Sequence, residues 1–286
     1  MRTLKLTIAY DGKAYAGWQC QSGEPTVQRT LENAIEKVAG ESIRVLASGR
    51  TDAGVHALGQ VVGFRTECPL PPDVIVRALN ANLPPDIAVL DAAEVPDGFH
   101  AIRDAVRKRY RYVIYDGPIR DIFSRHYAWH CRSGRLDAEA MRRAAEALRG
   151  THDFSSFESS GAERKTSIRT VFDLSIKRGR AGQGGLGIRD WGLEIGKTAC
   201  GFASSHVEYR RQDPATTVAP KNFITIEIEA DGFLYNMVRA IVGTLVEVGR
   251  GNRPETWPGE VLLATDRRTA GPTAPPQGLF LVHVEY

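Results

Sequence analysis

The chain has 286 residues, of which 42% are hydrophobic and 25% charged. These values exclude both a small disulfide-held domain and a chain that is disordered throughout. The net charge of +3 does not by itself indicate a nucleic-acid partner. No apolar run approaches the roughly 18 residues of a membrane-spanning helix, and the first residues do not form the apolar block of a signal peptide. We therefore expect a cytoplasmic protein without membrane contact.

The first half of the chain predicts the element order β-α-β-β-α-β. Alternating apolar residues between 4 and 10 indicate a half-buried strand that stops at Asp11–Gly12. Thr26 is expected to cap a helix whose apolar residues recur at helical spacing until Gly40. The remaining expected elements are strands at 43–48 and 59–65, a helix introduced by Pro71, Pro72 and Asp73, and a strand near 87–93.

The second half repeats this order. Tyr110, Tyr112 and Ile114 share one side of a predicted strand that again stops at an Asp-Gly pair. The further expected elements are a helix from Leu136 to Gly150, strands at 171–177 and 223–229, a helix at about 232–248 and a final strand at 279–286. We predict an α+β fold of two ferredoxin-like (split β-α-β) units, 1–105 and 106–286, whose antiparallel sheets flank a central active-site cleft.

Residues 178–220 interrupt this plan with a glycine-rich segment that lacks clear periodicity. The segment is far longer than an ordinary hairpin loop. One interpretation is a surface excursion with some β structure of its own. The alternative is a contribution to substrate binding, because the segment carries Trp191, Arg210 and Arg211.

Metal and cofactor signals are weak. Cys20, Cys68, Cys131 and Cys200 lie far apart and are expected to be reduced thiols. His126 and His130 have the spacing of a ligand pair on a helix, but the aromatic residues around them favour an extended segment. Glycine-rich motifs that hold nucleotide phosphates are missing. We therefore expect neither metal nor cofactor.

Positive charge is concentrated in one region. Residues 103–149 hold 12 Arg or Lys against 6 Asp or Glu. Within it, Arg107, Lys108, Arg109 and Arg111 surround Tyr110. A solvated strand edge would explain this density, but a basic stretch that contains an aromatic residue favours a path for RNA.

Residues 49–57 read Gly-Arg-Thr-Asp-Ala-Gly-Val-His-Ala and lie between two predicted strands. Arg50 and Asp52 are two apart, so in an extended loop they can share a face and form an ion pair that keeps the aspartate ionised. Such a carboxylate can act as a nucleophile or a base. The alternative is a turn with a surface salt bridge.

This run resembles the signature of the tRNA pseudouridine synthases of the TruA family, and other segments agree with that family in order and spacing. The resemblance covers nearly the whole chain and departs from the family at the 178–220 insertion. The matching residues are Tyr10–Gly12, Tyr15, Gly17–Gln19, Phe99–Ala101, Arg109–Tyr112, His152–Phe154, Ser156–Phe157, Asp231–Leu234, Met237–Arg239, Ile241–Gly243, Val248–Gly249, Ala274–Pro276 and Gly278–Leu279.

The resemblance implies isomerisation of uridine to pseudouridine at positions 38, 39 and 40 of the tRNA anticodon stem-loop, without a cofactor. It implies that Asp52 is the catalytic aspartate, that Arg50 assists base flipping and that Tyr110 stacks on the target base. Arg239 is expected near the aspartate, and a homodimer is expected. The residues expected to contact substrate are Tyr110, Tyr112, Arg107, Lys108 and Arg239.

Two other classes were weighed. A catalytically inactive RNA-binding protein of the same fold should lack Arg50, Asp52 or Tyr110, yet all three are present. A hydrolase with Asp52 as nucleophile would need a base and an oxyanion site near it, and His56 is a weak candidate for that base. Neither class explains the full-length resemblance.

Overall fold

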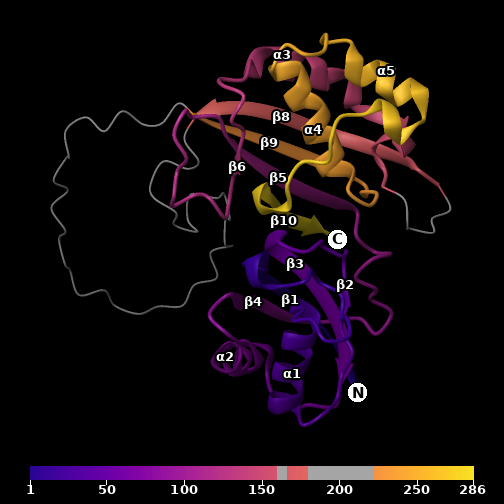
Figure 1. The fold of residues 1–286 in the computed structure, drawn as a ribbon. Coiled ribbons are helices and arrows are strands. Elements are labelled where there is room, and N and C mark those ends of the chain that lie inside the picture. Colours follow the sequence, from indigo (N-terminus) through magenta and orange to yellow (C-terminus); the bar gives the residue numbers. More distant parts are fainter. Residues whose placement is uncertain (160–165, 180–221) are drawn as a thin grey trace, which may run out of the picture.

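The computed structural model describes residues 1–159, 166–179 and 222–286. Their main feature is one ten-stranded sheet that runs through the whole molecule, with strand order β4-β1-β3-β10-β5-β9-β8-β7 (Figure 1). Two short strands lie off this path, with β2 paired to β3 and β6 paired to β5.

The strands are β1 (Arg2–Tyr10), β2 (Leu46–Ala47), β3 (His56–Thr66), β4 (Ile87–Val95), β5 (Arg107–Tyr115), β6 (Trp129–His130), β7 (Gly150–Asp153), β8 (Ile168–Gly179), β9 (Phe223–Ala230) and β10 (Leu279–Glu285). The helices are α1 (Val27–Ala39), α2 (Pro72–Asn82), α3 (Ala138–Ala145), α4 (Met237–Gly249) and α5 (Trp257–Ala264).

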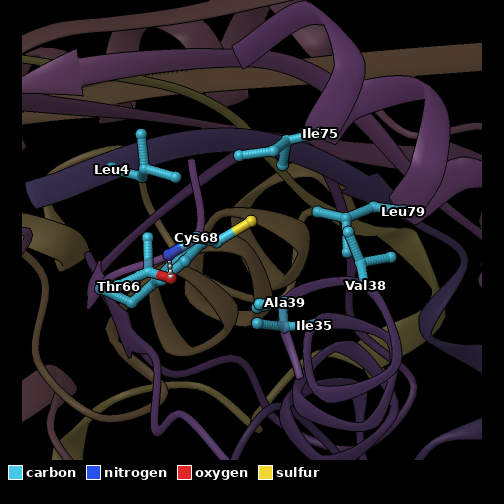
Figure 2. Close-up of a pocket in the computed structure, with 9 residues that line it drawn as sticks. Leu4, Ile35, Val38, Ala39, Thr66, Cys68, Ile75 and Leu79 are labelled. Carbon is cyan, nitrogen blue, oxygen red and sulfur yellow. Dashed lines mark hydrogen bonds between the residues drawn. The ribbon is translucent and has the colours of Figure 1, made fainter. Parts of the chain in front are cut away.

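In the first half, α1 and α2 lie together on one side of the strands in the order β4-β1-β3-β2 (Figure 1). Helix α1 buries Leu31 and Ile35 on the face that apolar spacing predicts, and it ends at Gly40, whose φ of 72° suits glycine. Thr26 occupies the position before the helix, but its hydroxyl does not cap it. A small apolar cavity of about 10 Å³ lies in this core, lined by residues that include Leu4 and Ile35 (Figure 2).

The second half repeats the arrangement. Its strands follow the order β10-β5-β9-β8, and every pair in that row is antiparallel, as in the first half. Helices α3, α4 and α5 pack together on one face of these strands (Figure 1). Helix α4 is buried on nearly all sides, because it lies between the sheet and the other helices.

The last strand joins the two halves. β10 pairs antiparallel with β5, and its residues Phe280 and Leu281 pair in parallel with His56 and Ala57 of β3. The prediction of two separate sheets is therefore wrong, because the backbone groups at the edge of each half bond to the same strand. Because β10 lies between them in the sheet, the start of β3 and strand β5 are separated by this one strand.

Several predicted boundaries also differ. The helix expected from Leu136 to Gly150 is α3, followed by a short 3-10 turn over Glu146–Leu148. The helix expected at about 232–248 begins at Met237, after Asn236 in a left-handed conformation with φ 61°. β7 and α5 were not predicted. Most of the 178–220 insertion, including Trp191, Arg210 and Arg211, lies outside the described residues.

Three cysteines, Cys20, Cys68 and Cys131, are free thiols, as predicted, and Cys200 lies outside the described residues. Across the described ranges, no helix is long and apolar enough to cross a membrane.

Candidate active site

The loop at 48–55 connects β2 to β3, and the segment after β1 holds it in place. The backbone N–H of Trp18 donates to the carbonyl of Thr51 at 3.0 Å, and the hydroxyls of Tyr10 and Thr51 are 2.8 Å apart. Gly17 has φ 100°, and a Cβ there would lie 2.8 Å from the Thr51 carbonyl oxygen. The loop and this segment therefore fit closely only with glycine at this position.

The ion pair predicted between Arg50 and Asp52 is not formed. The loop turns at once after Asp52, where the N–H of Val55 donates to the Asp52 carbonyl at 3.1 Å and Gly54 has φ 75°. The alternation of an extended chain therefore does not apply here. Arg50 is exposed, and the described residues supply no ion pair or hydrogen bond to its guanidinium.

Arg239 of α4 takes the place predicted for Arg50. Its Nη1 lies 2.9 Å from Oδ2 of Asp52, and the two side chains are 15% and 28% exposed. No described residue donates to the other carboxylate oxygen, Oδ1. One oxygen of Asp52 is thus fixed by a charge-assisted hydrogen bond, and the second remains available to a substrate.

The guanidinium of Arg239 is fixed by two further contacts. Its Nε donates to the carbonyl of Ala274 at 2.7 Å, and Nη1 also donates to Oδ1 of Asn236 at 2.8 Å. Pro276 follows closely, and its Cγ lies 3.3 Å from where a Cβ would stand at Gly54. The segment before β10 therefore contacts Arg239 and lies close to Gly54 in the loop that carries Asp52.

Tyr110 reaches the same region from β5. Leu281 of β10 pairs with Ala57 on one side and with Tyr110 on the other, so the three residues form one row across the sheet. Tyr110 is 8% exposed and meets Phe233 edge to face at 4.9 Å. Its hydroxyl has no hydrogen-bond partner within the described part of the chain.

Burial raises the pKa of Tyr110, and the nearby Tyr10 and the charge of Asp52 raise it further. Its phenol is therefore neutral at working pH and retains a proton that it can donate.

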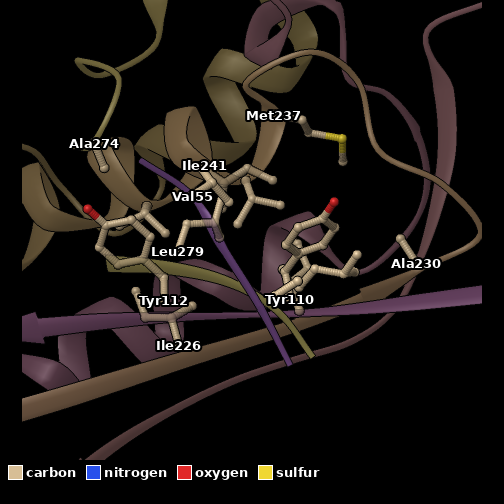
Figure 3. Packing of buried hydrophobic residues seen from close by; sticks show 14 of the residues in the cluster. Val55, Tyr110, Tyr112, Ile226, Ala230, Met237, Ile241, Ala274 and Leu279 are labelled. Carbon is tan, nitrogen blue, oxygen red and sulfur yellow. The ribbon is translucent and has the colours of Figure 1, made fainter. Parts of the chain in front are cut away.

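Tyr112 lies on the same face of β5 as Tyr110, and both belong to the buried cluster that also contains Met237 and Ile241 of α4 (Figure 3). It is fully buried, and its hydroxyl donates to the carbonyl of Pro275 at 2.7 Å. A direct contact with substrate would require the Pro275 segment to move.

The predicted basic residues of β5 divide between two faces. Lys108 shares a face with the tyrosines, and its Nζ donates to the carbonyl of Ser48 at 2.6 Å, where the loop begins. Arg107 lies on the opposite face and pairs with Glu229 at 3.4 Å and with Glu285 at 3.7 Å. Their contact with RNA stays a prediction.

His56 is buried directly behind the loop. The N–H of Gly12 donates to its Nδ1 at 3.1 Å, so Nε2 carries the proton and donates to the carbonyl of His126 at 3.0 Å. The ring stacks on Phe280 with 4.7 Å between centroids. Burial lowers the pKa of His56, and Asp11, 3.0 Å from Nδ1, opposes that shift. These contacts leave the ring unable to serve as a base beside Asp52.

The described residues contain no group of three or more side chains placed to bind a metal ion. The segment that carries His126 and His130 was expected to be extended, and it ends in the short strand β6. His130 Nε2 lies 3.0 Å from the carbonyl oxygen of Gly117, to which it is hydrogen-bonded.

An aspartate that is held by an arginine through one oxygen, with the other oxygen open, defines a site for acid-base or nucleophilic chemistry. The chain matches the family described as tRNA pseudouridine synthase over residues 6–103 and 144–286. It therefore belongs to the tRNA pseudouridine synthase family, whose members are isomerases.

Relatives agree over the full length of the chain. Proteins named tRNA pseudouridine synthase A from Thermoanaerobacter sp. strain X514 and from Acetivibrio thermocellus are each 42% identical, over 286 and 287 residues, and 100% of both chains is covered in each comparison. A protein of the same name from Moorella thermoacetica is 43% identical over 289 residues, again with 100% of both chains covered.

Proposed function

We propose that this protein isomerises uridine to pseudouridine at positions 38, 39 and 40 of the tRNA anticodon stem-loop, with Asp52 as the catalytic residue. The observation that carries this proposal is the hydrogen bond between Arg239 and Oδ2 of Asp52, which leaves Oδ1 without a donor among the described residues. Family membership supports the reaction class, and the resemblance described above supports the position in tRNA.

The reaction rearranges bonds within one nucleotide. Asp52 attacks the nucleoside or removes a sugar proton, and the bond between the ribose C1′ and the base N1 breaks. The base rotates and rejoins C1′ through its C5. The C5 atom then loses its proton and N1 gains one, so no electrons leave the molecule. No redox cofactor is needed, and we expect full activity in the presence of a metal chelator.

The target base must leave the helical stack before Asp52 can reach it, at a cost of a few kcal/mol. We assign the displacement of the base to Arg50, because its guanidinium is exposed and can enter the vacated space. Tyr110 receives the base, and its neutral phenol can donate a hydrogen bond. Arg239 orients Asp52.

The hydrolase alternative finds little support. A hydrolytic mechanism needs a base that activates water near the nucleophile. His56 follows Asp52 closely in the sequence, but its two ring nitrogens are engaged with Gly12 and with the carbonyl of His126. The geometry favours isomerisation, in which the aspartate acts without a second base.

The deciding experiment maps pseudouridine in purified tRNA after incubation with wild type and with Asp52→Asn, both in a chelator. Asparagine keeps the shape of the side chain but removes its charge and its nucleophilic oxygen. We expect the variant to fold, to bind tRNA with similar affinity because affinity depends mainly on phosphate contacts, and to form no pseudouridine. Substantial product from a folded Asp52→Asn protein would refute the assignment.

We also propose that 1–105 and 106–286 are two ferredoxin-like units and that the protein acts as a cytoplasmic homodimer. The repeated antiparallel orders β4-β1-β3-β2 and β10-β5-β9-β8 support the first point. The resemblance supports the second. Light scattering on a size-exclusion column tests it, and a mass of one chain would contradict it.

A further inference from the structure

The arginines of the basic 103–149 region fall into two sets that differ in their partners. Those on β5 face acidic side chains of neighbouring strands. Arg109, for example, lies 2.9 Å from Glu229, 3.2 Å from Glu227 and 3.4 Å from Asp173. The positive charge of this set is therefore largely balanced within the protein, which weakens its attraction for phosphate.

Arg120 and Arg132 belong to the second set, on the chain between β5 and α3. Both are exposed, and the described residues supply neither an ion pair nor a hydrogen bond to either guanidinium. Together they line a cavity of about 450 Å³. The only carboxylate in its described lining, Asp121, already accepts a hydrogen bond from the N–H of Phe123 at 3.0 Å. With Arg125, the described lining carries three arginines against this one carboxylate, so the cavity has a net positive charge.

Aromatic rings form another part of the lining. Tyr115 and His130 lie with 5.4 Å between their centroids, and the His130 ring is fixed by its hydrogen bond to Gly117. Trp129 is half-buried, with its ring edge to face with Tyr112 at 6.4 Å. Fixed aromatic faces beside free guanidiniums are the combination that binds a nucleobase together with its phosphate. The volume falls in the range of sites that enclose a small ligand.

The cavity shares a wall with the catalytic site. Pro275 and Gln277 line it. The carbonyl of Pro275 accepts the hydroxyl of Tyr112, and the adjacent Ala274 carbonyl accepts Nε of Arg239. One short segment thus separates the cavity from the Asp52–Arg239 pair, so a single RNA molecule can reach both. The cavity-forming chain also lies in the stretch 104–143, between the two parts that match the family.

We propose that this cavity is a second nucleotide site, which binds one unpaired nucleotide of the substrate tRNA other than the target uridine. Arg120 and Arg132 contact its phosphate, and Tyr115, Trp129 and His130 contact its base. This site rests on the proposed function, because the occupant is part of the same RNA. The second site increases the affinity for tRNA and orients the bound RNA, whereas Asp52 carries out the reaction.

The first test removes the two free charges. Arg120→Gln with Arg132→Gln should weaken tRNA binding about tenfold and reduce the slope of log affinity against log salt by about 1, since both arginines contact the same phosphate and one neutralised phosphate contributes roughly 0.7 to 0.9. KM should rise while kcat changes less than about twofold. Arg29→Gln with Arg44→Gln is the matched control, because both are exposed and unpaired among the described residues but lie in the first half. Equal losses in the two double variants would overturn the proposal.

The second test locates the RNA directly. Wild-type protein is irradiated with tRNA that contains 4-thiouridine, and the crosslinked tryptic peptides are identified by mass spectrometry. We expect crosslinks on the peptide 126–132, which carries Trp129 and His130. Crosslinks confined to other peptides would refute the site while leaving the proposed function intact. A wild-type protein that makes no pseudouridine would instead refute the function itself.

Discussion

The orientation of Asp52, the proposed catalytic residue, depends on a residue 187 positions away in the chain, since Arg239 holds its Oδ2. Arg239 spans three acceptors that belong to Asp52, Asn236 and Ala274. Only a planar guanidinium with several fixed donors can serve all three at once. The orientation of the carboxylate is therefore a property of this one side chain.

Arg239→Lys should lower kcat about a hundredfold, because a point charge cannot hold Asp52 in place and a misplacement near 1 Å is that costly. KM should change little. Arg267→Lys is the control, since Arg267 also bridges the segment before β10, through Gly271 and Thr273, without touching Asp52. Steady-state kinetics of the two variants distinguish the roles. A similar kcat loss in both would mean that the segment as a whole matters.

His56 gives the protein a pH-dependent stability. Burial lowers its native pKa below the ordinary 6.5, so between these values the unfolded chain binds a proton that the native chain does not. The free energy of unfolding should then fall as pH drops below about 6.5, by at most about 1.4 kcal/mol per pH unit. Urea unfolding from about pH 8 to about pH 5 measures this slope.

His56→Gln should flatten that profile, because it removes the buried titrating ring. His126→Gln should flatten the profile less, because the pKa of His126 is also lowered, by partial burial and by the nearby charges of Lys13 and Arg125, but its side chain is less buried than that of His56. Unchanged slopes in both variants would assign the pH dependence to other groups.

At the residue scale, the sequence singled out Asp52 as the candidate reactive group, and the family resemblance predicted Arg239 near it, where the structure has the two side chains 2.9 Å apart. The motif around Asp52 was sufficient to select it, and Arg239 was conspicuous as a charge on an apolar helix. The pairing of Arg50 with Asp52 assumed a straight loop, and the turn at Gly54 removes that geometry. A contact across 187 residues leaves no local pattern, so the Asp52–Arg239 distance could not be read from spacing.

Among the elements, the segment after β1 acts as the support of the catalytic loop. Gly17→Ala places a Cβ 2.8 Å from the Thr51 carbonyl oxygen and forces a positive φ. We expect a loss of about 2–3 kcal/mol in unfolding free energy together with reduced kcat. Gly40→Ala has a similar φ of 72° but no atom within 4 Å, so it should cost about 1 kcal/mol and leave kcat unchanged. Equal kinetic effects would contradict the supporting role.

Elements with a strong period were predictable, and those defined by tertiary contacts were not. Helix α1 and strand β1 follow apolar patterns of period 3.6 and 2, so their positions were close to those expected. β2 shrinks to Leu46–Ala47 because only two of its residues pair with β3. α5 has eight residues and apolar positions on several sides, so its pattern gives no clear face.

At the scale of the whole molecule, the proposed function requires the two halves to keep a fixed position relative to each other. Asp52 comes from the first half, whereas Tyr110 and Arg239 come from the second. Their strands meet only through β10, which bonds to β3 on one edge and to β5 on the other. The sequence predicted both halves, but not this shared strand, because the pairing depends on residues more than 200 positions apart.

Two alanine substitutions in β3 distinguish the effect of the β3–β10 pairing on activity from a general loss of unfolding free energy. At Gly59 a Cβ would lie 2.6 Å from the backbone carbonyl of Val282 in β10, whereas at Gly63 it would meet the Phe99 side chain at 3.1 Å. Gly59→Ala therefore pushes the backbones of β3 and β10 apart, whereas Gly63→Ala displaces the Phe99 side chain, which also packs against Tyr286, and leaves the β3–β10 backbone contact in place. Both should lose about 1–3 kcal/mol in urea unfolding.

Only Gly59→Ala should also lose activity in its folded fraction, by about tenfold or more, because Asp52 then moves away from Tyr110 and Arg239. Pseudouridine formation is measured in dilute buffer, after unfolding curves show that both variants are fully folded there. If both keep the wild-type rate, the β3–β10 joint does not set the geometry of the site. If both lose it equally, the defect lies within the first half, in the loop that carries Asp52.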